Sequence, residues 1–178
     1  MAAPLDSSEP LASLRVAGLL DAVAARTPAP ASGSVSALVV ALAAGLTEMS
    51  ARFAPAGWED VAARAAELRA EAVRLADEDA AAYARFLADR DPGPIAAVPL
   101  RVAEIAAETS ELAARLAAGG NPNLRGDAAA GAALAAAASA SSALLVRINL
   151  EGFPGDERIA RAASFAKAAE SAARRALA

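Results

Sequence analysis

The stretch VAARAAELRAEAVRLADEDAAAYARF, Val61 to Phe86, decides the fold that the sequence predicts. Apolar or small residues recur in it at alternating steps of four and three, the spacing that places side chains on one face of an α-helix. The stripe consists of Val61, Ala65, Leu68, Ala72, Leu75, Ala82 and Phe86. The position in this series that carries a polar residue is Asp79. The pattern therefore predicts a long helix with one carboxylate on its buried face.

Composition extends this prediction to the whole chain. Of the 178 residues, 58 are alanine, the strongest helix former, and 56% are hydrophobic. Because alternating β-type patterns are almost absent, we expect an all-α fold in one domain over residues 1–178. Alanine side chains bury little area, so one copy alone would leave apolar surface uncovered, and we expect a homo-oligomer.

Charge and residue types exclude several classes of function. The net charge is −4, with 17 Lys+Arg dispersed among 21 Asp+Glu, so we expect no nucleic-acid partner. The chain has no cysteine and no histidine. Disulfides, thiolate nucleophiles, histidine triads and cysteine or histidine metal sites are thereby excluded, and no metal is expected. Proton chemistry must then use carboxylates, Tyr83 or the single lysine, Lys167.

The most apolar stretch, SVSALVVALAAGLTEMS from Ser34 to Ser50, raises the question of a membrane span. It contains Gly45, Thr47 and Glu48, and its uninterrupted apolar core is shorter than the ~20 residues that a bilayer requires. We therefore expect a buried central helix and no membrane partner. The N-terminus shows no secretory signal pattern, so we expect a cytoplasmic location.

Proline and glycine clusters divide the chain into six expected helices that form an antiparallel bundle. The first is expected to start after Ser7 or Ser8. The expected ranges are about 7–27, 34–53, 58–89, 95–118, 123–150 and 157–177. Residues 91–94 are an expected turn, and Asn123 is the expected cap of the fifth helix.

Asp79 is the first candidate functional residue. A carboxylate in an apolar seam is costly to keep charged unless it is paired, and burial moves its pKa toward the range useful for an acid or base. The alternative is a structural ion pair with an arginine of another helix. Asp77 and Glu78 lie about 200° and about 100° from Asp79 around the helix axis, so neither shares its face. Tyr83, one turn later, would either hydrogen-bond Asp79 or stack on a flat ligand.

Two helix starts supply further candidates. GNPNLRGD, residues 120–127, places Asn121, Asn123 and Asp127 beside free backbone amides, which suits a polar heterocycle or a carboxylate. The alternative reading of these residues is helix capping and the helix dipole.

The second start is TPAPASGS, residues 27–34. Gly33 permits an unusual backbone angle there, and Ser34 caps the following helix and leaves amides that could hold an anion. A stiff turn is the alternative. Asn149, near the end of a hydrophobic run, is either a ligand contact or a helix C-cap.

Five motifs, in this order along the chain, resemble the folate cyclodeaminase/cyclohydrolase family, which includes the C-terminal domain of formiminotransferase-cyclodeaminase and stand-alone methenyltetrahydrofolate cyclohydrolases. The motifs are TPAPASGSVSAL (27–38), ADEDAAAY (76–83), VPLRVAE (98–104), GNPNLRGDAAAGAAL (120–134) and VRINL (146–150). The resemblance implies an all-helical homodimer that acts on a tetrahydrofolate derivative. Family members either expel ammonia from 5-formiminotetrahydrofolate or add water to the 5,10-methenyl bridge.

The resemblance also implies roles for individual residues. The aspartate of the family's DxDA motif corresponds to Asp79 and would be the acid/base. The substrate would be bound by Gly33, Ser34, Tyr83, Asn121, Asn123, Asp127 and Asn149. The Ser34 helix start would receive an anionic or carbonyl group of the substrate.

The chain departs from the family pattern at three places. Pro30, Ala31, Ser32, Gly33 and Ser34 stand where the family usually has Pro-Gly-Gly-Gly-Ser. Leu145 replaces an asparagine, and a basic segment that commonly precedes the VPL motif is missing. Two rival hypotheses remain beside the enzyme: a helical dimer that binds a folate-like anion without turnover, and a structural interaction protein.

Overall fold

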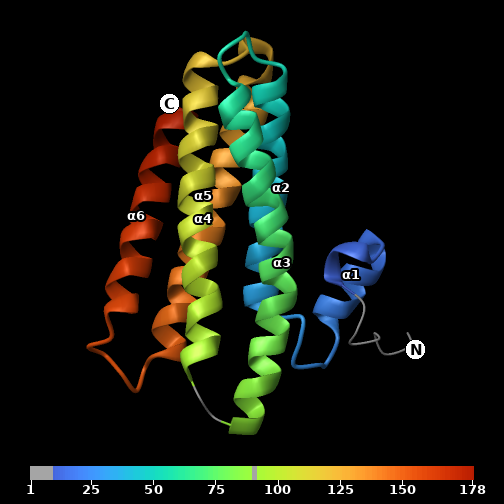
Figure 1. The fold of residues 1–178 in the computed structure, drawn as a ribbon, viewed down its shortest axis with the longest axis vertical. Helices are drawn as coiled ribbons and strands as arrows, with labels where there is room; N and C mark the ends of the chain where they lie inside the picture. Colours follow the sequence, from blue (N-terminus) through green and yellow to red (C-terminus); the bar gives the residue numbers. More distant parts are fainter. Residues whose placement is uncertain (1–9, 90–91) are drawn as a thin grey trace.

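A computed structural model describes residues 10–89 and 92–178, which form six α-helices and two short 3-10 helices (Figure 1). The α-helices are α1 (Val16–Ala24), α2 (Ser32–Arg52), α3 (Glu59–Asp89), α4 (Pro92–Gly119), α5 (Arg125–Asn149) and α6 (Glu157–Leu177). Helices α2 to α6 run up and down side by side, with α6 on one flank and α2 and α3 on the other (Figure 1). The predicted all-α antiparallel bundle is confirmed.

Small residues let the bundle helices approach closely. A Cβ atom on Gly131 of α5 would lie 3.2 Å from the carbonyl oxygen of Ala43 in α2, which is tighter than ordinary van der Waals contact. Larger side chains such as Leu68, Ile105 and Leu116 fill the space between the helices and are almost fully buried. The core therefore combines alanine seams with a few large aliphatic side chains.

The N-terminal part differs from the expected first helix. Residues 7–9 lie outside the described residues, and Leu11–Ser13 form a 3-10 turn that is separated from α1 by the extended residues Leu14 and Arg15. A continuous helix to residue 27 is therefore a wrong prediction. Leu11 is buried, and its backbone N–H donates to the Asp77 carboxylate at 2.9 Å, so a tertiary contact replaces the helical one. We call residues 12–31 the N-terminal arm.

The fourth helix begins earlier than expected. The predicted turn over residues 91–94 is wrong at Pro92, Gly93 and Pro94, which form the first turn of α4. Asp91 lies outside the described residues. Prolines are tolerated in this turn because its backbone N–H groups have no partner within the helix.

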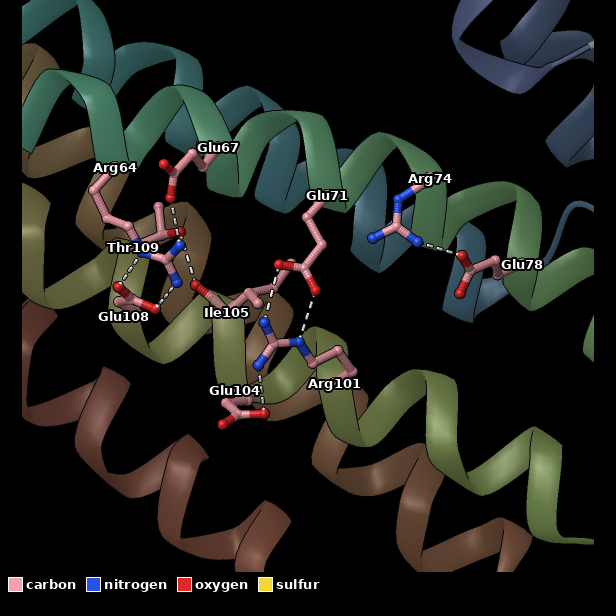
Figure 2. A network of polar contacts seen from close by, with 10 residues as sticks. All are labelled: Arg64, Glu67, Glu71, Arg74, Glu78, Arg101, Glu104, Ile105, Glu108 and Thr109. Carbon is pink, nitrogen blue, oxygen red and sulfur yellow. Dashed lines mark hydrogen bonds and ion pairs between the residues drawn. The ribbon is translucent and has the colours of Figure 1, made fainter.

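The seam between α3 and α4 is polar on its outer side (Figure 2). Arg101 of α4 donates from Nε to Glu71 of α3 at 2.7 Å and pairs with Glu104 at 2.8 Å. Arg64 of α3 bonds both carboxylate oxygens of Glu108, at 2.6 and 2.8 Å. In a two-point contact, the guanidinium group forms two parallel hydrogen bonds with one carboxylate. Such a contact adds to the attraction between the charges and also fixes the register of the two helices.

Arg101→Gln is expected to make the bundle less stable at neutral pH but equally stable in acid. The Arg101 hydrogen bond is the main reason that the pKa of Glu71 lies below its ordinary value. A lowered carboxyl pKa contributes stability above the unfolded pKa of about 4.3, and that contribution disappears as the pH falls. We expect a loss of about 0.5–1 kcal/mol at pH 7, because the pair is partly exposed. Urea unfolding at pH 7 and pH 3 measures it, and an equal loss at both pH values would contradict the prediction.

Helix α2 is the central helix that the sequence predicts, since it packs against α3, α4 and α5. By length and composition, α2 and the segment Pro122–Asn149 could each cross a membrane. The outer side of these helices carries exposed or half-buried aliphatic side chains and has no charged residue from 32 to 47 or from 128 to 146. We call this surface the α2–α5 face; it includes Leu42, Leu46, Leu134, Leu145 and Ile148.

Candidate active site at Asp79

The Asp79 carboxylate of α3 lies against the first turn of α2. Ala31, the N-cap residue of α2, makes no side-chain capping hydrogen bond. The Ser34 hydroxyl instead donates to Asp79 Oδ2 at 3.1 Å, and the Ser34 backbone N–H also donates to this carboxylate. A side chain from a neighbouring helix thus satisfies an amide that α2 leaves unpaired. The helix start binds a carboxylate of the protein itself.

Gly33 makes this approach possible. A Cβ atom on Gly33 would lie 2.0 Å from Asp79 Oδ1 and 2.6 Å from Oδ2, well inside the distance of non-bonded contact. Gly33 and Ser34 are buried, whereas Ala31 and Ser32 are exposed. Among Ala31, Ser32 and Gly33, Gly33 is thus the position where the Asp79 contact requires a glycine.

The surroundings of Asp79 favour its protonated form more than water does. Burial raises the pKa of this carboxyl above its ordinary value, and the hydrogen bonds from the hydroxyl and the backbone N–H of Ser34 act in the opposite direction. In the described part of the chain Asp79 has no ion pair, and the structural alternative of an arginine partner is not observed there. A half-buried carboxyl with two donors and no cation beside it keeps its proton to a higher pH than an exposed aspartate does.

Glu48 shows what a structural carboxylate looks like in the same bundle. Its side chain is 6% exposed, and it pairs with Arg52 at 2.5 Å and with Arg69 at 2.9 Å. Two guanidinium groups compensate its burial. No arginine compensates Asp79 in this way among the described residues.

The acids beside Asp79 have other partners, as the helical spacing predicts. Asp77 accepts the Leu11 backbone N–H, and Glu78 pairs with Arg74 at 2.5 Å on the exposed side (Figure 2). Sequence reasoning missed the Leu11 contact, because 66 residues separate the two groups. Tyr83 lies one turn after Asp79, is 40% exposed, and has its ring centroid 6.5 Å from that of Phe86. The hydrogen-bond donors to Asp79 among the described residues come from Ser34, not from Tyr83.

Asn121, Asn123 and Asp127 lie at the opposite end of the bundle. Asn121 donates from Nδ2 to the carbonyl oxygen of Phe53, just beyond the last residue of α2, and its Oδ1 accepts the Asn123 N–H at 3.0 Å. The predicted Asn123 cap is wrong: Asn121 caps the 3-10 turn Pro122–Leu124, and the N-cap of α5 is Leu124. The sequence favours Asn121 over Asn123 as a cap, because Asn121 precedes a proline and is therefore held in the extended conformation that a cap residue adopts.

The distance between Asp79 and the Asn121 end of the bundle follows from the length of α2. This helix has 21 residues, which corresponds to about 30 Å, and it begins at the Asp79 end and finishes at the Asn121 end. Asp127 is half-buried in the first turn of α5. One chain therefore does not bring these residues to Asp79.

Asn149 lies at the same end of the bundle as Asp79. It is the last residue of α5, and its Nδ2 donates to the carbonyl oxygen of Ile95 near the start of α4. The helix C-cap is Leu150, so Asn149 is not a C-cap. Its amide connects two helices instead.

Comparisons with known proteins agree on one family. A family model described as formiminotransferase-cyclodeaminase matches residues 15–91 and 94–171. A crystal structure of formiminotetrahydrofolate cyclodeaminase from Thermotoga maritima superposes with a TM-score of 0.86 at 25% identity, over 93% of this chain and 95% of that one. A formimidoyltransferase-cyclodeaminase from Dictyostelium discoideum is 48% identical over 46 residues, which are 26% of this chain and 9% of that relative's length.

Proposed function

Because this chain belongs to the formiminotransferase-cyclodeaminase family, we propose that it is a folate-dependent one-carbon enzyme in which Asp79 is the acid/base. The observation that carries the proposal is the half-buried Asp79 carboxyl, with Ser34 as its donor and no cation beside it within the described residues. The substrate is a tetrahydrofolate derivative, either the 5-formimino or the 5,10-methenyl compound. No metal takes part in the proposed mechanism.

Both reactions form one bond to the bridging carbon and break another, and both need a group that takes and donates protons there. In the hydrolysis, a water oxygen bonds to the methenyl carbon as Asp79 takes one of the water's protons. Asp79 then returns that proton to N5 as the bond between N5 and the carbon breaks, and the hydroxyl proton passes to solvent, which leaves a formyl group on N10. In the deamination, N10 of the folate bonds to the formimino carbon, and the proton of N10 passes to the formimino nitrogen. Asp79 donates one further proton to that nitrogen as its bond to the carbon breaks, so that ammonia departs and the methenyl bridge remains. A carboxyl whose pKa is raised is a stronger base when ionised and keeps its proton to a higher pH, so the same residue serves either direction.

The other residues of the proposed site follow from their position. Ser34 and Gly33 hold the Asp79 carboxylate, and the exposed Tyr83 ring is placed one turn away to stack on the flat pterin. Asn149 lies at the same end. Asn121, Asn123 and Asp127 are about 30 Å away in one chain, so this mechanism does not use them.

The test is a paired assay of the purified chain. We expect it to accelerate the loss of methenyltetrahydrofolate absorbance, the release of ammonia from 5-formiminotetrahydrofolate, or both. Tight folate binding in calorimetry without either product would support the non-catalytic alternative instead. Neither binding nor turnover would leave the structural alternative.

Ser34→Ala is expected to move the pH profile of the hydrolysis. The Ser34 hydroxyl bond lowers the pKa of Asp79, so its removal raises that pKa further. The base is the ionised form, and the ascending limb of kcat/KM against pH should therefore shift to higher pH. Ser32→Ala, at an exposed neighbouring serine, should leave the limb in place. A lower rate with an unmoved limb would show that Ser34 does not act through Asp79.

A homodimer and a cytoplasmic location are part of the same proposal. The α2–α5 face supports the dimer, because Leu42 is 67% exposed, Ile148 is 52% exposed, and no charge interrupts the face over most of both helices. A strip two helices wide and about 30 Å long presents roughly 600 Å² per copy, near the upper end for the largest apolar patch of a monomer. A standard interface buries about 800 Å² per partner, so a second copy is the natural cover.

A further inference from the structure

The N-terminal arm carries an apolar surface that its own bundle does not cover. Val16, Leu20 and Val23 follow one another at helical spacing in α1 and are 74%, 64% and 41% exposed. Helix α1 stands apart beside α3, with sparse contacts to the bundle (Figure 1). The arm is nevertheless fixed at both ends, because Leu11 before it bonds Asp77 and Ser34 after it bonds Asp79.

A groove of matching character lies between α5 and α6. Its volume is about 670 Å³, and alanines such as Ala137, Ala140 and Ala163 form most of its wall, with Leu144 and Ile159. Small wall residues let another helix approach closely, as they do within the bundle. The groove is apolar and open, which is the surface that an apolar helix covers.

The charges of the two surfaces are complementary. Asp21 is the one charged residue of α1 and is exposed. Arg147 and Lys167 line the groove. Within residues 10–89 and 92–178 none of these three takes part in a recorded ion pair, whereas Glu170, the acid of the groove, is paired with Arg174. A helix with an acid thus matches a groove with two available cations.

Helix α1 does not lie over the groove of its own chain. Figure 1 shows α1 on one flank of the bundle and α6 on the opposite flank. The two surfaces are nevertheless at the same height, because α1 leads into the start of α2 and the groove lies toward the α5–α6 turn, both at one end of the bundle. The α2–α5 face lies behind α3 and α4 in this view. A two-fold axis along that face and parallel to the helices would carry the α6 flank of a second copy to the α1 flank of the first.

We propose that two copies of this chain exchange their N-terminal arms, so that α1 of each copy lies in the α5–α6 groove of the other. Val16, Leu20 and Val23 face the alanine wall, and Asp21 meets Arg147 or Lys167. The exchange is reciprocal about the two-fold axis, so it closes at a dimer. It adds two helix contacts to the α2–α5 face and raises the buried area toward that of a standard interface.

Disulfide trapping tests the contact directly, because the chain has no natural cysteine. Under mild oxidation, the variant that combines Leu20→Cys with Leu144→Cys should form a covalent dimer and no larger covalent oligomers. Leu20→Cys combined with Leu177→Cys is the matched control, since Leu177 is also 64% exposed but is not part of the groove. Monomer on a non-reducing gel, or equal crosslinking of both pairs, would overturn the proposal.

Sedimentation of variants gives an independent measurement. Leu20→Asp should weaken the dimer roughly ten- to a hundredfold, while Leu177→Asp should leave it unchanged. Asp21→Lys should weaken the dimer roughly two- to fivefold, and adding Lys167→Asp should restore it. Circular dichroism should show the same melting of the bundle for all variants at concentrations where they are monomeric. A wild type that sediments as a monomer, or a dimer indifferent to Leu20→Asp, would refute the exchange, whatever the assays of folate turnover show.

Discussion

Asp79→Asn is expected to abolish turnover without weakening the fold. The substitution keeps the shape and an acceptor for the Ser34 hydroxyl but removes the proton that the mechanism transfers. Acid–base groups contribute about 10²–10⁴ in rate, so we expect a loss of at least that size on whichever folate is the substrate. Binding of the folate, measured by calorimetry, should change little.

The stability of the Asp79→Asn variant distinguishes a functional acid from a structural one. Because the folded pKa of Asp79 lies above that of the unfolded chain, its ionisation opposes folding. The free energy of unfolding therefore falls as the pH rises from about 4 through the raised pKa, and the asparagine variant escapes this loss. Its melting temperature at pH 7 should equal or exceed that of the wild type.

Glu48→Gln is the matched control, and its expected result is the reverse. Glu48 is deeply buried between Arg52 and Arg69, so loss of its charge should cost roughly 1–3 kcal/mol of stability. It lies toward the other end of α2 from Ser34, so the rate per folded molecule should remain. If the Asp79→Asn variant melts at a lower temperature than the wild type and still turns over folate, Asp79 has a structural role and not a catalytic one.

Gly33→Ala is expected to have the second-largest effect. The new Cβ would overlap Asp79 Oδ1, so the carboxylate must leave the first turn of α2. We expect turnover to fall nearly as far as in Asp79→Asn, together with a loss of about 1–3 kcal/mol from overpacking and from the lost hydrogen bonds. Gly45→Ala in the same helix meets only ordinary contact with Arg69, at 3.6 Å, and should be neutral or stabilising by about 0.5–1 kcal/mol.

A double-mutant cycle identifies the cause of the Gly33 effect. In an Asp79→Ala background the carboxylate is absent, so Gly33→Ala should cost little stability. If the cost is the same in both backgrounds, the glycine is required by the backbone of α2 and not by Asp79. Urea unfolding of the four proteins provides the cycle.

Much of the fold could be predicted from local pattern. The spacing from Val61 to Phe86 predicted α3 as a single long helix, and the apolar run from Ser34 to Ser50 predicted a central helix. The same spacing placed Asp79 on the inner face and excluded Asp77 and Glu78 from it, as the structure shows. Helical periodicity is a short-range property, so one sequence is enough to read it.

Contacts between distant segments could not be predicted in the same way. The Leu11 amide on Asp77 and the Asn121 amide on Phe53 join residues 66 and 68 positions apart and have no local signal. They explain why the first helix is broken and why the Asn123 cap was assigned to the wrong residue. The family resemblance implied that Asn121, Asn123 and Asp127 share a substrate site with Asp79, whereas the up-and-down topology separates them within one chain by the length of a helix.

The anchoring of the N-terminal arm allows its length to change in evolution while the packing of the bundle stays the same. Its two ends are held within one turn of α3, at Asp77 and Asp79, so the stretches on either side of α1 can lengthen or shorten without altering the register of the bundle. Homologues would then diverge in length before Val16 and after Val23 while keeping both anchors and the apolar face of α1. The same property makes the stretch between α1 and α2 a suitable place to insert a foreign peptide.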